Sequence, residues 1–264
     1  MSKSDTLVWE IKGDNIKSPS YIFGTMHVQD DKAFKNIEFI ENLINQSNSF
    51  AAEYDLGIED PESFHQAILL EDGLSLSSLL SPKIYQKLSI LFEKETSFDL
   101  ADYNRHKPIM VINMLTGAQF SNDRHVSLDQ HLYDFAKNKG LNLLGIESFD
   151  SQVEVLKKMP LKDQLKSLKE MATHFERFRR NIKKTTEIYI EADLQKLLKK
   201  VKKTAGGMRS LLLYDRNVIM ADRIASLAQE NSLFAAIGAG HLAGKKGVLR
   251  LLKMKGLQVT PIFY

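Results

Sequence analysis

The chain has 264 residues, 43% hydrophobic and 26% charged, the balance of an ordinary globular protein with room for one large domain or two small ones. The formal net charge of +3 is too small to predict nucleic-acid binding, and the absence of cysteine excludes disulfides and thiolate chemistry. The N-terminus lacks the apolar core of a signal peptide, and no apolar run reaches membrane-spanning length. We therefore expect a cytoplasmic protein, or an exported one if a leader has been removed.

The N-terminal part is predicted to form a hairpin followed by a helix and another strand. Residues 7–12 and 20–25 have strand composition and are separated by turn residues. Apolar residues recur with a helical period over residues 34–44, and residues 50–55 have the composition of a buried strand. The order strand, helix, strand predicts a parallel unit with a crossover connection.

The rest of the chain is predicted to be mostly helical until it returns to strands near its end. Helices dominate residues 61–120, a strand follows at 141–145, and a long helix covers 211–227. Pro261 lies in the last strand and predicts that this strand is at a sheet edge. We expect an α/β protein with a mixed sheet, strands at both ends of the chain, a helical middle and a pseudo-two-half arrangement around one site.

A basic stretch separates the helical middle from the C-terminal part. Between Lys157 and Arg209 there are 16 Lys and Arg against 6 Asp and Glu, with apolar residues at helical spacing. Such helices usually have a solvated basic face, and the alternative is binding to an acidic partner or a membrane surface. We expect residues 1–264 to form a single domain with a basic helical insert at about residues 150–205.

Two segments far apart in the sequence share the pattern Gly-x-x-His directly after a strand. The first ends at His27 and the second at His241. Each histidine stands at the carboxyl end of a strand, where it is suited to bind a metal or move a proton. The pair suggests two halves of one site, and the alternative is two strand-to-helix turns that each contain a hydrogen-bonding histidine.

Two glutamates and one arginine complete the set of candidate polar residues. Glu53 and Glu147 lie at strand ends, where a carboxylate is costly to bury unless it is paired or bound to metal. The alternative for Glu53 is an acid at the surface edge of the sheet. Arg216 lies in a mainly apolar context and therefore needs an anionic partner. It either pairs structurally with Glu53, Asp55 or Glu147, or stabilises an oxyanion.

These residues occur in an order that resembles the TraB/GumN family, which includes the TIKI proteins. The resemblance extends from about Leu7 to Ile262, and its most specific block is Gly-Ala-Gly-His-Leu-Ala-Gly at residues 238–244. It rests on Trp9-Glu10-Ile11, Gly-Thr-Met-His at 24–27, Ala52-Glu53-Tyr54-Asp55, Leu128-Asp129, Leu144-Gly145-Ile146-Glu147 with Gln152, Asp215-Arg216-Asn217 and the block ending at Val248. The resemblance implies a fold related to erythromycin-esterase and haem-binding ChaN-like proteins. It also implies a metal-dependent peptidase that uses manganese or cobalt and the paired histidines.

On this basis we expect metal-assisted hydrolysis of a peptide or another small substrate. His27 and His241 would supply nitrogen ligands and Glu53 and Glu147 oxygen ligands, a set that suits manganese, cobalt, iron or zinc. Glu53 could instead act as general base, and Arg216 would stabilise the oxyanion. The expected substrate-binding residues are Asp129, Gln152, Tyr214 and Asn217.

Three alternatives to a metal-dependent hydrolase stay open at this stage. A metal-free hydrolase would use His27 as its base, with the glutamates orienting the histidines. An iron- or haem-binding protein would have no catalytic activity. A partner-binding protein would act through its basic helices while the site stays idle.

Overall fold

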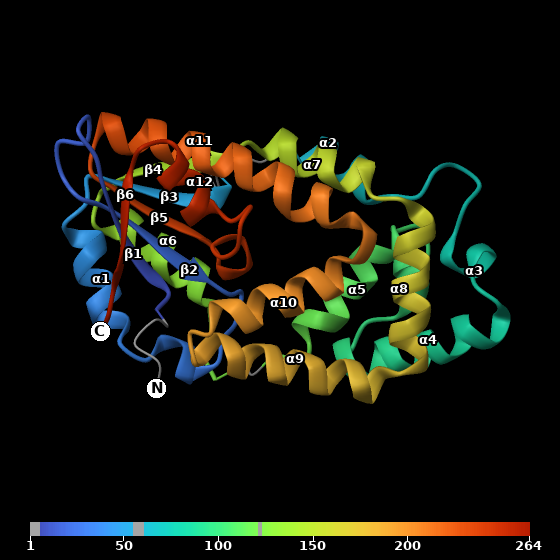
Figure 1. Ribbon diagram of the computed structural model, residues 1–264. Helices are drawn as coiled ribbons and strands as arrows, with labels where there is room; N and C mark the ends of the chain where they lie inside the picture. The colour runs from blue at the N-terminus through green and yellow to red at the C-terminus, as the bar shows by residue number, and fades with distance from the viewer. Residues whose placement is uncertain (1–5, 55–60, 121–122) are drawn as a thin grey trace. The chain divides into compact units, whose positions relative to one another are not determined.

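A six-stranded mixed sheet organises the computed structural model, which describes residues 6–54, 61–120 and 123–264 (Figure 1). The strands follow the order β4-β3-β5-β2-β1-β6 across the sheet. They are β1 (Val8–Lys12), β2 (Ser20–Thr25), β3 (Ser49–Tyr54), β4 (Asn142–Glu147), β5 (Leu233–Gly238) and β6 (Gln258–Ile262). The predicted α/β class, with strands near both ends of the chain and a helical middle, is confirmed.

Four neighbouring strands of the sheet are parallel. β4 pairs with β3, β3 with β5, and β5 with β2, all in parallel. β1 is antiparallel to both β2 and β6, which confirms the predicted N-terminal hairpin. β6 lies at the edge of the sheet, so Pro261 costs no ladder hydrogen bond on its open side.

Helices from the same compact unit cover the sheet on both faces (Figure 1). They are α1 (Ile37–Asn45), α6 (Leu128–Asn138), α11 (Asp215–Glu230) and α12 (Val248–Met254). α6 packs on α1, β3 and β4, whereas α11 packs on α12, β4 and β5. Coverage of both faces explains why β2 and the first five residues of β5 are buried throughout.

Aromatic side chains fill the layer between the sheet and α6. Phe50 of β3 stacks on Phe234 of β5 with ring centroids 5.8 Å apart, and Tyr133 of α6 meets Phe50 edge-on at 6.4 Å.

Helix α1 begins three residues later than the helical period of the sequence predicted. The turn η1 (Asp31–Phe34) comes first, and Asn36 then adopts a left-handed conformation at φ 67°.

The chain divides into two compact units. The first comprises Met1–Glu59, Ser121–Gln152 and Thr185–Tyr264 and contains the sheet. The second comprises Asp60–Phe120 and Val153–Lys184. Since the basic stretch contributes to both units, the single domain with an insert at about 150–205 stays a prediction.

The second unit is helical, as the sequence predicts for residues 61–120. Its buried core includes Leu88, Phe92, Leu115 and Leu168. Its elements are α2 (Pro61–Ile68), α3 (Leu76–Leu79), α4 (Pro82–Thr96), η2 (Leu100–Tyr103), α5 (Pro108–Gly117), α8 (Leu161–Thr173), most of α7 (Phe149–Lys158) and the first part of α9 (Phe175–Ile190).

The segment before α11 departs from the predicted single long helix. α10 (Leu194–Ala205) is followed by the turn η3 (Gly206–Met208), and η4 (Ser210–Tyr214) is a π-helical turn directly before α11. Such turns are rare and frequently occur at functional sites.

None of the helices in the described ranges is long and apolar enough to cross a bilayer. The cellular compartment stays a prediction.

Gly247→Ala is expected to destabilise the sheet-containing unit. A Cβ at this position would collide with the backbone carbonyl oxygens of Leu242 and Ala243, which no side-chain rotation can relieve. We expect a loss of about 1–3 kcal/mol in the free energy of unfolding, measured by urea denaturation. Gly207→Ala is the matched control, since a Cβ there meets nothing within 4 Å. Equal stability of the two variants would contradict this packing.

Candidate functional site

The candidate site lies at the carboxyl edge of the parallel strands. Glu147 is the last residue of β4, Glu53 lies one residue before the end of β3, and Gly238 ends β5. Because β4, β3 and β5 are adjacent and parallel, residues nearly 200 positions apart in the sequence meet at one edge. Ligands and active sites of open α/β sheets are typically found at this edge.

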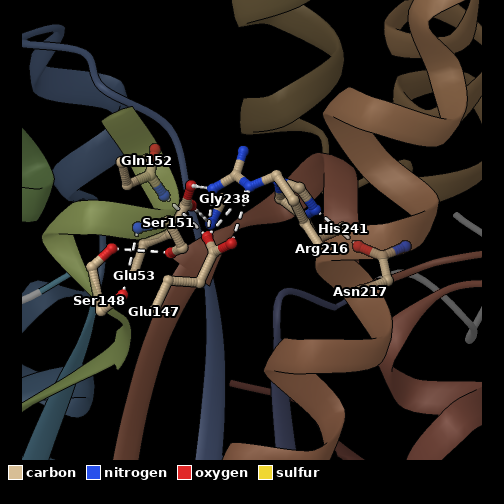
Figure 2. Close-up of polar contacts among 9 residues, drawn as sticks. All are labelled: Glu53, Glu147, Ser148, Ser151, Gln152, Arg216, Asn217, Gly238 and His241. Atoms are coloured by element: carbon tan, nitrogen blue, oxygen red, sulfur yellow. Dashed lines mark hydrogen bonds and ion pairs between the residues drawn. The ribbon is translucent and has the colours of Figure 1, made fainter. Parts of the chain in front are cut away.

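Arg216, in the first turn of α11, joins the two glutamates (Figure 2). Its Nε donates to both carboxylate oxygens of Glu147, at 3.1 and 3.0 Å, and one terminal nitrogen pairs with both Glu147 and Glu53. The second oxygen of Glu53 accepts the backbone N–H of Gly238 at 3.0 Å, and Gln152 donates to Glu147 at 2.8 Å. The sequence left open whether Arg216 would pair with these glutamates, and the structure contains that pairing.

Burial and the arginine act in opposite directions on the two carboxyl groups. The Glu147 side chain is only 1% exposed, and its burial raises its pKa although Arg216 opposes that shift. Burial would also raise the pKa of Glu53, but His241 when protonated, Arg216 and the Gly238 N–H together lower it below its ordinary value. Glu53 is therefore the more readily ionised of the two carboxyl groups.

His241 is buried beside this cluster and is held by one side chain. Its Nδ1 lies 2.6 Å from Oδ1 of Asn217, whose Nδ2 donates to the carbonyl of Lys246 at 2.7 Å. Since the Asn217 amide must offer its NH₂ group to Lys246, its oxygen faces His241 and accepts the Nδ1 proton. Burial lowers the pKa of His241, although Glu53 opposes this shift. The result is a neutral imidazole with the lone pair on Nε2.

Asn217→Ala is expected to abolish the preference of the His241 ring for the tautomer protonated at Nδ1. In the wild type, nitrogen-15 NMR of the imidazole should show a protonated Nδ1 and an unprotonated Nε2. The alanine variant should show a mixture of the two tautomers. Loss of such an orienting partner typically lowers metal affinity or activity about 10- to 100-fold. An unprotonated Nδ1 in the wild type would contradict the assignment.

His27 lies in a different environment. Its side chain is 81% exposed, and Nδ1 is 3.7 Å from Oδ2 of Asp129, too far for a hydrogen bond. Asp129 nevertheless raises the pKa of His27. Oδ2 of Asp129 is itself buried and has no hydrogen-bond partner. A buried carboxylate oxygen without a partner is a place where a cation or an ordered water would be stabilised.

The backbones of the two Gly-x-x-His segments pack side by side. Thr25 of β2 is in register with Gly238 of β5. A Cβ on Gly24 would lie 2.6 Å from a methyl group of Leu242 and 3.1 Å from Cβ of Ala239, so only glycine allows this approach. The two segments therefore meet, but no hydrogen bond or ion pair in the described ranges joins the side chains of His27 and His241.

The remaining candidates divide between the cluster and its surroundings. Gln152 and Asn217 contact site residues directly, as described above. Tyr214 contacts lysines instead, with the Nζ atoms of Lys246 and Lys202 lying 4.6 and 5.8 Å from its ring centre. Asp55, offered above as an alternative partner of Arg216, lies outside the described residues.

Two contributions were not predicted from the sequence. Tyr189, in α9, is buried and donates its hydroxyl hydrogen to the carbonyl of Gly24 at 3.0 Å, which fixes the first Gly-x-x-His segment. The backbone carbonyl of Lys246 orients Asn217. The only signal for Tyr189 in the sequence is an aromatic residue within a basic amphipathic helix, and no sequence pattern predicts a contact with a backbone carbonyl.

The donor set fits a divalent cation in its chemistry. It offers imidazole and carboxylate groups, His241 keeps Nε2 free for a ligand, and Oδ2 of Asp129 lacks a hydrogen-bond partner. Glu53 and Glu147 together carry more negative charge than Arg216 neutralises. Within the described ranges, however, no three His, Asp or Glu side chains converge closely enough to hold an ion. Arg216 occupies the place between the two glutamates.

The fold and site define an α/β protein with a polar site at the carboxyl edge of its parallel strands. The chain belongs to the TraB/PrgY/gumN family, whose family model matches residues 7–261. It is 26% identical to Metalloprotease TIKI2 of Danio rerio, over 97% of this chain and 60% of that protein. It is 23% identical to Metalloprotease TIKI1 of the same species, over 98% and 63%, and 22% identical to a Metalloprotease TIKI homolog of Nematostella vectensis, over 97% and 66%.

These matches cover nearly all of this chain but less than two thirds of each relative. The chain therefore spans about 60% of the length of the curated relatives it matches. No solved structure matches the chain significantly.

Proposed function

We propose that this protein is a metal-dependent hydrolase that cleaves amide bonds in peptides. The metalloprotease names of its distant relatives support a hydrolase of this class. The observation that carries the proposal is the buried His241, whose Asn217 partner leaves a neutral Nε2 beside the ionised Glu53. A free imidazole lone pair next to a carboxylate suits both metal ligation and proton transfer.

His27, His241, Glu53 and Glu147 are the residues that would hold the ion, which would be manganese, cobalt, iron or zinc. When bound, such an ion supplies Lewis-acid polarisation of a carbonyl group and acidification of water. Asn217 orients His241 in the manner of the outer partners that fix metal-binding histidines, and Asp129 lies close enough to His27 to favour its approach to the ion by charge. Gln152 restrains Glu147 through its hydrogen bond.

Glu53 and Arg216 supply the remaining chemistry of the proposed site. Where Glu53 is not a ligand of the ion, it accepts a proton from the attacking water, because its lowered pKa keeps it ionised at neutral pH. Arg216 stabilises the negative charge that develops on the carbonyl oxygen. Only Nε and one terminal nitrogen of Arg216 are engaged by the glutamates in the described structure, so its other terminal nitrogen is available to the substrate. Tyr214 would contact the substrate from the side of the basic helix α10.

Metal content and peptide hydrolysis test this proposal. Wild-type protein purified without chelators or nickel resin should retain near-stoichiometric metal by mass spectrometry, and His27→Ala and His241→Ala should lose it. His174→Ala is the control, since this histidine is exposed at the end of α8. Removal of the metal should abolish cleavage of a peptide library, and re-addition should restore it. Wild-type protein that binds no manganese, cobalt, iron or zinc would refute the proposal.

A further inference from the structure

A pocket of about 480 Å³ lies along α10, in the same unit as the candidate site. This volume is in the range of ordinary ligand pockets. Four of its lining residues are cations, and none is acidic. We call it the basic pocket; its lining residues are Gln195, Leu198, Lys199, Lys202, Lys203 and Arg209.

The charges of the basic pocket are not neutralised by the protein. Lys196, on the same helix but outside the pocket, pairs with Asp193 at 2.8 Å. None of the ion pairs found in the described part of the chain involves a cation of the pocket. Lys199 and Lys203 are four residues apart on one helix, a spacing at which like charges repel. An anionic ligand would relieve this repulsion.

Arg209 is held in position to face such a ligand. Its Nε donates to the carbonyl of Lys202 at 2.8 Å, which ties the segment after α10 back to the helix. The guanidinium group therefore lines the pocket with the lysines. A fixed guanidinium offers paired N–H donors to a carboxylate, which gives directionality as well as charge.

α10 connects the basic pocket to the segment that contains His241. Leu198, which lines the pocket, packs so closely on Gly244 that a Cβ there would lie 2.6 Å from its methyl group. Val201 packs in the same way on Gly240, at 3.1 Å. Leu198 and Val201 thus bring α10 directly against the loop on either side of His241. Leu198 therefore contacts both the pocket and the loop that contains His241.

We propose that the basic pocket binds an acidic stretch of the peptide substrate. The substrates would then be peptides that contain clustered Asp or Glu residues. This inference rests on the proposed peptidase function. It adds a specificity site outside the cluster of Glu53, Glu147 and Arg216. Carboxylate side chains of an extended peptide would pair with Lys199, Lys203 and Arg209.

The surroundings of the pocket favour a peptide over a nucleic acid or a membrane. Binding of single-stranded nucleic acid normally uses exposed aromatic rings as stacking platforms. No aromatic residue lines the pocket, and the ring of the nearby Tyr214 has the ammonium groups of Lys202 and Lys246 near it. A membrane-binding helix needs apolar side chains that face the lipid. The leucines Leu194 and Leu197 of α10 are instead buried in the core.

Fluorescence anisotropy with a labelled Glu-rich peptide tests the proposal on the chain of 264 residues. The double variant Lys199→Gln/Lys203→Gln should bind this peptide about ten-fold more weakly than the wild type, since it loses two exposed ion pairs. The same loss is expected for the wild type with a peptide in which Gln replaces Glu. Binding should weaken as salt is added. The control Lys166→Gln/Lys169→Gln removes the same charge from exposed positions on α8 and should bind like the wild type.

Equal binding of the Glu-rich peptide by both double variants would overturn the proposal. So would tighter binding of a single-stranded oligonucleotide or of anionic vesicles than of the peptide. Cleavage assays separate this inference from the proposed function. Binding at the pocket without cleavage of any peptide would refute only the hydrolase. Cleavage without a preference for acidic peptides would refute only the role of the pocket.

Discussion

Arg216→Met is expected to lower the free energy of unfolding by about 3 kcal/mol. The guanidinium is the only cation that pairs with Glu53 and Glu147 in the described structure. The Glu147 side chain is 1% exposed, so its carboxylate would be left without a partner in a place that water hardly reaches. Urea denaturation at neutral pH, with the transition of the sheet-containing unit followed, measures the loss.

A divalent cation should restore part of the stability of Arg216→Met. With the guanidinium gone, the two carboxylates form an unneutralised anionic pair, and an ion bound there stabilises the folded state by mass action. Manganese should therefore raise the denaturation midpoint of Arg216→Met more than that of the wild type. This result would show that the positive charge of Arg216 weakens the binding of a metal ion by the two glutamates.

The triple variant Arg216→Met/Glu53→Gln/Glu147→Gln is the control for both effects. It removes the cation and both anions together, and replacement of a whole buried ion-pair cluster is often close to neutral. Its stability should approach that of the wild type and should not respond to manganese. A denaturation midpoint of Arg216→Met equal to that of the wild type would contradict this account of the cluster. So would a response to manganese that is as large in the triple variant as in Arg216→Met.

Glu53→Gln is expected to lower kcat by about 10²- to 10⁴-fold while leaving the fold intact. The amide oxygen of glutamine can still accept the Gly238 N–H, and although its NH₂ group then faces Arg216, that guanidinium keeps its hydrogen bonds to Glu147. What is lost is the negative charge and the capacity to accept a proton from water. The rate on any peptide that the wild type cleaves, together with the denaturation midpoint, separates the two effects.

Glu41→Gln is the matched control for this variant. Glu41 is a partly buried glutamate of the same unit that contacts His131 at 2.8 Å, away from the candidate site. It should retain wild-type kcat. If Glu53→Gln kept full activity, Glu53 would be neither base nor ligand. If both variants lost activity in proportion to their loss of stability, the lower kcat of Glu53→Gln would result from a change in structure.

Most of the fold could be predicted because its elements have strong local signals. The apolar runs at residues 20–25 and 233–238 have the composition of buried strands, and both become central parallel strands. Pro261 predicted an edge strand, and β6 lies at the edge. The local signal failed at residues 210–214, where a π-helical turn interrupts the helical period without any change in composition.

The sequence by itself determined which residue types stand at strand ends: Glu53, Glu147, His27 and His241. It could do so because hydrophobic period and turn residues are local properties. Only the tertiary structure decided how these side chains are partnered. The strand order β4-β3-β5 places Glu147 next to Glu53, and α11 then inserts Arg216 between them. Strand order and helix docking depend on packing between segments far apart in the chain, which no local pattern records. For the same reason, the sequence could not reveal that His27 faces solvent while His241 is buried against Asn217.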